Sequence, residues 1–101
     1  MKTKTEKNNV KVPETKVFDF RKIPVLNIRD EVESIDVHEH LGNVIYNTTS
    51  DIGAADKGRE MFHKGKVELT QREANYFSDL FWNSSAIAAP LKTALKEFLK
   101  F

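Results

Sequence analysis

Between residues 16 and 37 the apolar and polar positions follow the period of β-strands. Residues 17–20 (VFDF) alternate apolar and polar side chains, and residues 23–28 (IPVLNI) form a second short apolar run rich in branched residues. Alternation with a period of two is typical of a strand with one buried face. Pro24 indicates an edge strand or the beginning of a strand, because proline cannot donate a hydrogen bond to a β-ladder.

The residues that follow leave two alternatives open. Val32, Ile35 and Val37 can supply a third short strand, or they can lead directly into the first helix. We therefore predict a small antiparallel hairpin or a three-stranded sheet over residues 16–37.

From residue 38 onward the apolar positions recur at helical spacing. Asp36 is positioned to cap a first helix, and the polar residues 47–50 (NTTS) end it, because short hydroxyl and amide side chains compete for backbone hydrogen bonds. The apolar positions of this helix are Leu41, Val44 and Ile45, with Tyr46 as a marginal member of the set.

A second helix is predicted from Ser50 or Asp51, as its cap, to about Lys64. Gly65 ends it, since glycine readily adopts the positive φ of a helix C-terminus. Gly53 and Gly58 are poor helix formers, so they either allow another element to approach closely or break the helix.

A third helix begins with the clearest local signal in the chain. Thr70 followed by Glu73 is a capping box, in which each side chain accepts a hydrogen bond from a backbone amide at the helix start. The helix is predicted to reach about Asn83. On a helical wheel, one side carries four apolar residues, with Tyr76 at its edge, and we interpret this side as core: Ala74, Phe77, Leu80 and Phe81.

Trp82 falls among the polar positions of the third helix. We expect it to pack under residues 83–86 against a last helix; the alternative is an exposed anchor for a partner. Ser84 or Ser85 is predicted to cap that last helix, with Pro90 in its first turn. Its apolar positions have the spacing of a buried face: Ile87, Leu91, Ala94, Leu95 and Phe98.

These elements predict an α+β fold that is predominantly helical, with a short N-terminal β-hairpin or small antiparallel sheet followed by about four packed helices. Residues 13–101 are expected to form a single small domain. Residues 1–12 contain almost no apolar side chains before Val10, so we expect a disordered basic tail. Its lysines are Lys2, Lys4, Lys7 and Lys11.

Composition excludes several classes of function. The chain has no cysteine, which rules out disulfides, cysteine zinc sites and thiol nucleophiles. No run approaches the ~18 apolar residues of a membrane span, and no apolar segment follows the charged N-terminus. We therefore expect no membrane segment, no secretion signal and a cytoplasmic location.

Residues 38–40 (HEH) are the most suggestive metal-ligand candidates. On a helix, however, the two histidines diverge by about 200° and cannot share one ion. The chain also contains neither a phosphate-binding glycine loop nor a serine nucleophile elbow. We expect a non-enzymatic protein without a cofactor, a metal or catalytic residues.

The net charge is +1, but its distribution is uneven, with five acids and no lysine or arginine in residues 30–39. This acidic stretch would steer a basic partner. We therefore expect a protein that binds another protein, or a second copy of itself, and no small-molecule substrate is evident. The candidate contacts are Trp82, Asp30, Glu31 and Glu33.

The alternative function is nucleic-acid binding. The predicted helices within residues 38–64 are joined by a short polar turn, as in a helix-turn-helix. The second of them is nearly neutral, which disfavours a groove-reading helix. The candidate contacts are Lys57, Arg59 and Lys64, together with the four lysines of the tail.

Residues 41–77 (LGNVIYNTTSDIGAADKGREMFHKGKVELTQREANYF) resemble small uncharacterised proteins of phages and mobile elements. The resemblance rests on the order of an apolar helix, an NTTSD turn, a second helix, an HKGKVELT segment and a third helix. It implies an accessory role in such an element and assigns no activity to any residue.

Overall fold

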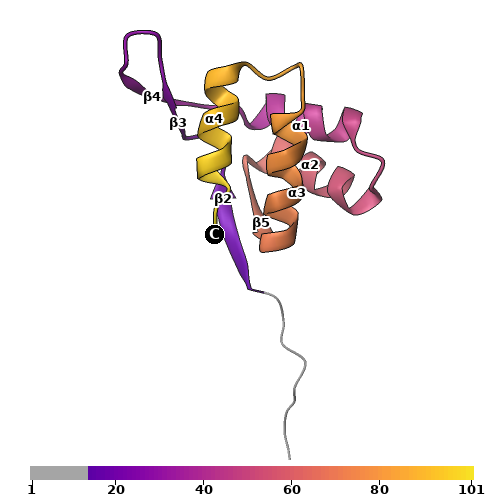
Figure 1. The fold of residues 1–101 in the computed structure, drawn as a ribbon. Helices are drawn as coiled ribbons and strands as arrows, with labels where there is room; N and C mark the ends of the chain where they lie inside the picture. Colours follow the sequence, from indigo (N-terminus) through magenta and orange to yellow (C-terminus); the bar gives the residue numbers. More distant parts are fainter. Residues whose placement is uncertain (1–13) are drawn as a thin grey trace, which may run out of the picture.

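The computed structural model describes residues 14–101, and the arrangement of its elements is shown in Figure 1. The fold is α+β and predominantly helical, as predicted, with four helices and two small antiparallel sheets in the described residues. The elements in chain order are β2 (Thr15–Asp19), β3 (Ile23–Leu26), β4 (Val32–Ile35), α1 (His38–Thr48), α2 (Ile52–Lys64), β5 (Lys66–Thr70), α3 (Gln71–Trp82) and α4 (Ala89–Phe98).

All three predicted strands form, and Val32 and Ile35 belong to the third of them, β4. The three strands do not make one sheet: β3 pairs with β4 in a hairpin. β2 pairs instead with β5, in a register that places Phe18 opposite Val67. β5 is a strand that the sequence did not predict. It has only two buried apolar side chains, Val67 and Leu69, and its last residue, Thr70, is also the cap of α3.

Three of the predicted helix ends are confirmed. Asp51 caps α2 by accepting a hydrogen bond from the Gly53 amide at 3.2 Å, and Gly65 ends it at φ 82°. The capping box at the start of α3 is complete, since Thr70 Oγ1 accepts from the Glu73 amide and Glu73 Oε1 accepts from the Thr70 amide. Local side-chain chemistry therefore fixes where these helices begin and end.

Two predicted caps lie elsewhere. The N-cap of α1 is Val37, although Asp36 still accepts from the His38 amide at 3.2 Å. The N-cap of α4 is Ala88 rather than Ser84 or Ser85, while Pro90 lies in the first turn as predicted. Ser84 instead accepts from the Ala86 amide, which makes it part of the α3–α4 link.

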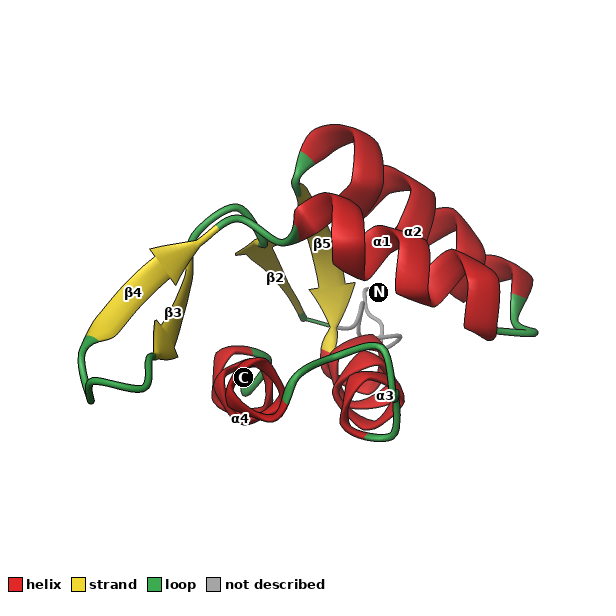
Figure 2. Ribbon diagram, turned by 90° about the horizontal axis from the view of Figure 1, so that it is seen from above, coloured by secondary structure: helices red, strands yellow, loops and turns green. Residues whose placement is uncertain are grey.

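The helices α1 and α2 run side by side in opposite directions, joined at one end by a short turn (Figures 1 and 2). Gly42 and Gly58 lie at their closest approach: a Cβ on Gly42 would be 2.6 Å from the Gly58 carbonyl oxygen. Gly58 therefore allows close packing and does not break α2, which resolves the alternative left by the sequence.

One cluster of buried side chains joins the β2–β5 sheet to the helices. The predicted apolar side of α3 is confirmed as core, with Ala74, Phe77 and Phe81 fully buried and Leu80 partly buried. The largest other buried side chains are Phe18, Phe20, Ile23, Leu41, Ile45, Met61, Leu69, Leu95 and Leu99.

None of the helices in residues 14–101 is long and apolar enough to cross a membrane.

The β3–β4 hairpin extends away from this packed body on the side of α4 (Figures 1 and 2). Its base is held by Ile23 and Val25, which are buried, and by the Val37 amide, which donates to the Phe20 carbonyl at 3.0 Å. The hairpin is therefore attached to the body at its root, while its outer end is free of the core.

Candidate protein-binding surface

The loop at the outer end of the hairpin is organised by one asparagine. Asn27 Oδ1 accepts hydrogen bonds from the backbone amides of Arg29 at 2.9 Å and Glu31 at 3.0 Å. The Asn27 amide donates to the Glu31 carbonyl at 2.8 Å, and its side-chain amide donates to Glu33 Oε2 at 3.2 Å. This loop thus has a defined shape, with Asp30 in the left-handed region at φ 62°.

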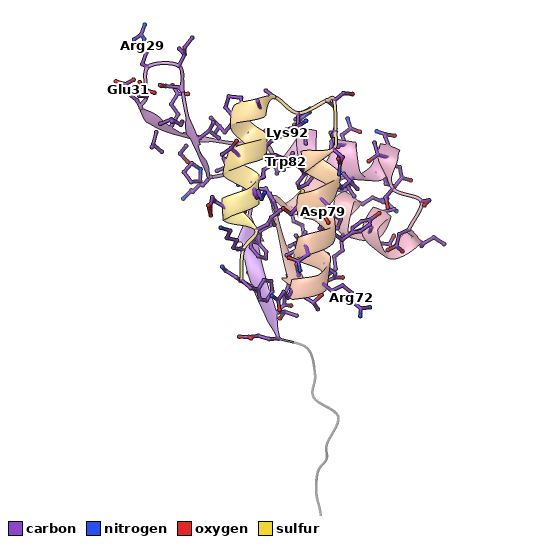
Figure 3. All side chains as sticks on the ribbon, in the orientation of Figure 1. Arg29, Glu31, Arg72, Asp79, Trp82 and Lys92 are labelled. Atoms are coloured by element: carbon purple, nitrogen blue, oxygen red, sulfur yellow. The ribbon has the colours of Figure 1, made fainter. Side chains whose placement is uncertain are left out.

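The predicted acidic contacts lie together on this hairpin. Asp30, Glu31 and Glu33 are all exposed, and Glu31 lies at the outer end close to Arg29 (Figure 3). Arg29 is the one cation in residues 27–36, a segment that also contains Asp36. The outer half of the hairpin is therefore negatively charged.

The same hairpin exposes apolar side chains that the sequence analysis did not single out. Ile28 is 98% exposed, Val32 70% and Leu26 54%. Leu26 and Val32 are opposite each other in the ladder, so they lie on the same face of the hairpin. In the sequence, their exposure is indicated only by their position beside Pro24 and a run of acids, where a core strand is not expected.

A groove of about 630 Å³ runs between this face and the outer side of α4. From the hairpin it is lined by Pro24, Leu26 and Val32, and its one charged lining residue is Glu97. Its other lining residues come from α4: Pro90, Thr93, Ala94 and Phe98. We call the groove together with Leu26, Ile28 and Val32 the hairpin surface.

Trp82 lies apart from the hairpin surface, over the pair of helices α3 and α4 (Figure 3). The prediction that it is buried is wrong, since 48% of it is exposed. The helix α3 continues through Trp82, so the indole projects from the polar side of the helix, as its position on the helical wheel indicates. Lys96 of α4 covers a face of the ring, with its Nζ 4.7 Å from the ring centre, a cation–π contact.

Three candidate residues of the nucleic-acid alternative lie on α2, within the described residues. Lys57 Nζ donates to the Glu68 carbonyl at 2.8 Å, on the side of α2 that faces β5. Arg59 lines a different hollow, of about 420 Å³, between α1 and α2 with Tyr46 and His63. Lys64 is exposed at the end of α2. Lys57 and Arg59 therefore have different surroundings on α2.

The helix pair itself also differs from a helix-turn-helix, in which the second helix crosses the first to enter a groove. Here α1 and α2 are antiparallel neighbours (Figure 2). The remaining candidates of this alternative, Lys2, Lys4, Lys7 and Lys11, lie outside the described residues, as does the expected tail. Nucleic-acid binding stays a prediction.

The three histidines are in separate environments. His38 is hydrogen-bonded to Asp36 through its Nδ1, and this bond lowers the pKa of the Asp36 carboxyl. His40 Nε2 lies 3.1 Å from the Ala86 carbonyl, and the His63 ring packs edge-on against Phe62. Within residues 14–101, no three histidine or acidic side chains are grouped to hold a metal ion.

Comparisons with protein-family models, with curated proteins and with solved structures found no match to this chain. The function is therefore argued from the geometry of the chain itself.

Proposed function

We propose that this protein is a non-enzymatic accessory protein that acts by binding another protein through the hairpin surface. The observation that carries the proposal is the exposure of Leu26, Ile28 and Val32 on one hairpin, where Leu26 and Val32 line an apolar groove. Apolar side chains gathered on one exposed feature and rimmed by charges are typical of protein interaction sites.

The energetics of this surface support binding. Complete burial of one such apolar side chain contributes about 1.5–3 kcal/mol before the costs of association are subtracted. The acids at the outer end steer a basic partner toward this surface, because a negative surface increases the rate of encounter with it. Asp30, Glu31 and Glu33 therefore act beside the apolar contact in this proposal.

The biological setting that we propose follows from the resemblance of residues 41–77 to small proteins of phages and mobile elements. In that setting the protein acts in the cytoplasm, as an assembly component or as a modulator of a host system. Trp82 is a second, smaller contact candidate, since half of its indole is accessible beside Lys96.

A comparative pull-down tests the proposal. The full chain, the double variant L26D/V32D and the control I52D are immobilised and exposed to a lysate of the source organism. Ile52 is also an exposed apolar residue, at 80%, but it lies at the start of α2. We expect a protein that is captured by the wild type and by I52D and is lost with L26D/V32D.

Two outcomes would contradict the proposal. One is a captured protein that binds L26D/V32D as well as it binds the wild type, which would place the contact elsewhere. The other is a wild type that captures no more than a blank matrix. Circular dichroism melts of all three proteins show whether the substitutions leave the fold intact.

A further inference from the structure

We propose that the partner binds as an extended segment that adds a third strand along the outer edge of β4. This inference rests on the proposed function, since it takes the hairpin surface as the contact. It adds the mode of binding and the chemistry of the partner: a strand in which apolar and basic residues alternate.

The register of the hairpin shows which backbone groups point outward. In an antiparallel pair, opposing residues alternate between pairs that exchange hydrogen bonds and pairs that do not. The Asn27 amide donates to Glu31, so the bonded positions continue at the Val25–Glu33 pair. The intervening pairs, Leu26–Val32 and Pro24–Ser34, are the non-bonded ones, which fits Pro24 because it has no amide hydrogen.

In a non-bonded pair, the amide and carbonyl groups point away from the neighbouring strand. Val32 and Ser34 therefore direct their backbone groups to the outer edge of β4, and both residues are exposed. In the described part of the chain, β4 has β3 as its only neighbour in the sheet. An added strand finds two donors and two acceptors at this edge.

The other edge of the hairpin does not offer the same groups. On β3 the outward positions are Leu26 and Pro24; Pro24 lacks a donor, and α4 packs against β3. Proline at an edge is a common means of preventing strand addition. Because the β3 edge is blocked and the β4 edge is open, a strand can be added to the hairpin only beside β4.

The side chains around the open edge define the partner. Side chains of an added strand alternate between the two faces of the sheet. On one face they meet Val32 and Ser34, with Leu26 and the groove beyond Val32, which favours apolar residues. On the other face they meet Glu31 and Glu33, which favours lysine or arginine.

A second copy of this chain fits the edge poorly. Pairing β4 with β4 of another molecule would bring together two sets of the acids Asp30, Glu31 and Glu33. Like charges on neighbouring strands destabilise a pairing. The acids thus protect the edge against self-association and at the same time select a basic partner.

The test uses the full chain and a short, end-capped, fluorescent peptide that alternates lysine and valine. We expect it to bind in fluorescence anisotropy titrations and to slow hydrogen exchange of the Val32 and Ser34 amides. A glutamate–valine peptide is the charge control. A lysine–valine peptide that is N-methylated at the amides facing the edge is the backbone control. We expect at least a tenfold weaker affinity for each control peptide.

A matched pair of protein variants tests the same edge. Ser34→Pro removes the outward amide and no bond of the β3–β4 ladder, whereas Ser34→Thr keeps that amide. We expect Ser34→Pro to weaken peptide binding roughly tenfold, as for the loss of one well-formed hydrogen bond, and Ser34→Thr to bind like the wild type. Unchanged exchange at Val25 and Ile35 shows that the hairpin is intact; if it is not, the methylated peptide decides.

Several results would overturn the inference. No binding of the lysine–valine peptide, or equal binding of the methylated or the acidic peptide, would do so. Protection of the Val32 and Ser34 amides in the chain alone at high concentration would show a second copy at the edge. If a captured natural partner loses affinity with L26D/V32D but not with Ser34→Pro, strand addition is excluded while the proposed function stands.

Discussion

The packed body and the β3–β4 hairpin use the same kinds of apolar residue in opposite ways. In the body, Ile45 and Leu95 are fully buried, whereas Ile28 and Val32 of the hairpin are largely exposed. In the body, the apolar side chains are packed in the core, while on the outer hairpin they are largely exposed. In our proposal, the body therefore carries folding and the hairpin carries binding.

The largest difference between the two regions is expected when an aromatic ring is removed from the core. Phe81→Ala is expected to lower the free energy of unfolding by about 3–5 kcal/mol, because it leaves a cavity at a fully buried position. Ile28→Ala on the hairpin is expected to change it by less than about 0.5 kcal/mol. Urea denaturation of both variants measures the contrast. Equal stability of the two variants would contradict the assignment of Phe81 to the core and of Ile28 to the free surface.

Adding a methyl group inside the packed body should also lower the stability of the fold. Gly42→Ala would place a Cβ 2.6 Å from the Gly58 carbonyl oxygen and 2.8 Å from Phe62 Cβ, so we expect a loss of about 1–3 kcal/mol. Gly53→Ala is the control, since its Cβ would meet only Asp51 Oδ1, at 3.7 Å. Thermal melts should separate the two variants, and a stable Gly42→Ala would mean that α1 and α2 can move apart freely.

Hydrogen-bonding side chains should show a smaller contrast. Thr70→Ala removes one half of the capping box and is expected to cost about 1 kcal/mol of global stability. Asn27→Ala removes the bonds to the Arg29 and Glu31 amides, which shape only the hairpin loop. We expect faster hydrogen exchange in residues 28–33 and little change in the melting temperature. A large global loss with Asn27→Ala would tie the hairpin to the core.

The smallest expected effect is at the junction between the two regions. The side chain of Arg21 donates two hydrogen bonds to the carboxylate of Asp19, at 2.9 and 3.0 Å, and these bonds lower the pKa of Asp19 from 3.8 to about 2. A lowered pKa stabilises the fold above pH 4, and the contribution is lost as the pH falls from about 4 to about 2.

Because this ion pair is partly exposed, its contribution is below about 1 kcal/mol. Asp19→Asn should therefore lower stability slightly at pH 7 and make no difference at pH 2, as measured by urea denaturation at both values. A difference that persists at pH 2 would assign the effect to packing instead of charge.

Much of the fold could be predicted because its signals are local. The capping box at Thr70 and Glu73, the stop at Gly65 and the apolar side of α3 each depend on residues within one or two helical turns. The strand β5 could not be predicted, because its partner β2 lies some fifty residues earlier in the chain. A two-residue alternation beside a helix cap is too short a signal to show that pairing.

The candidate surface was predictable only in part. The charges of Asp30, Glu31 and Glu33 are visible in the sequence, and the structure places them together. The exposure of Leu26, Ile28 and Val32 had only an indirect signal, their position beside Pro24 and the acids, because apolar residues in and near short strands commonly face a core. Trp82 shows the same limit, since its exposure depends on where α4 packs.

The attachment of the hairpin has a consequence for how this chain can vary. Phe20 and Val37 lie at the two ends of the segment that forms the hairpin, and the backbone bond between them closes its base. Residues between Leu26 and Val32 can therefore be lengthened, shortened or exchanged without shifting the helices. Relatives of this chain are expected to keep the closing contact while the arm beyond it diverges in length and chemistry, so that one scaffold serves different targets.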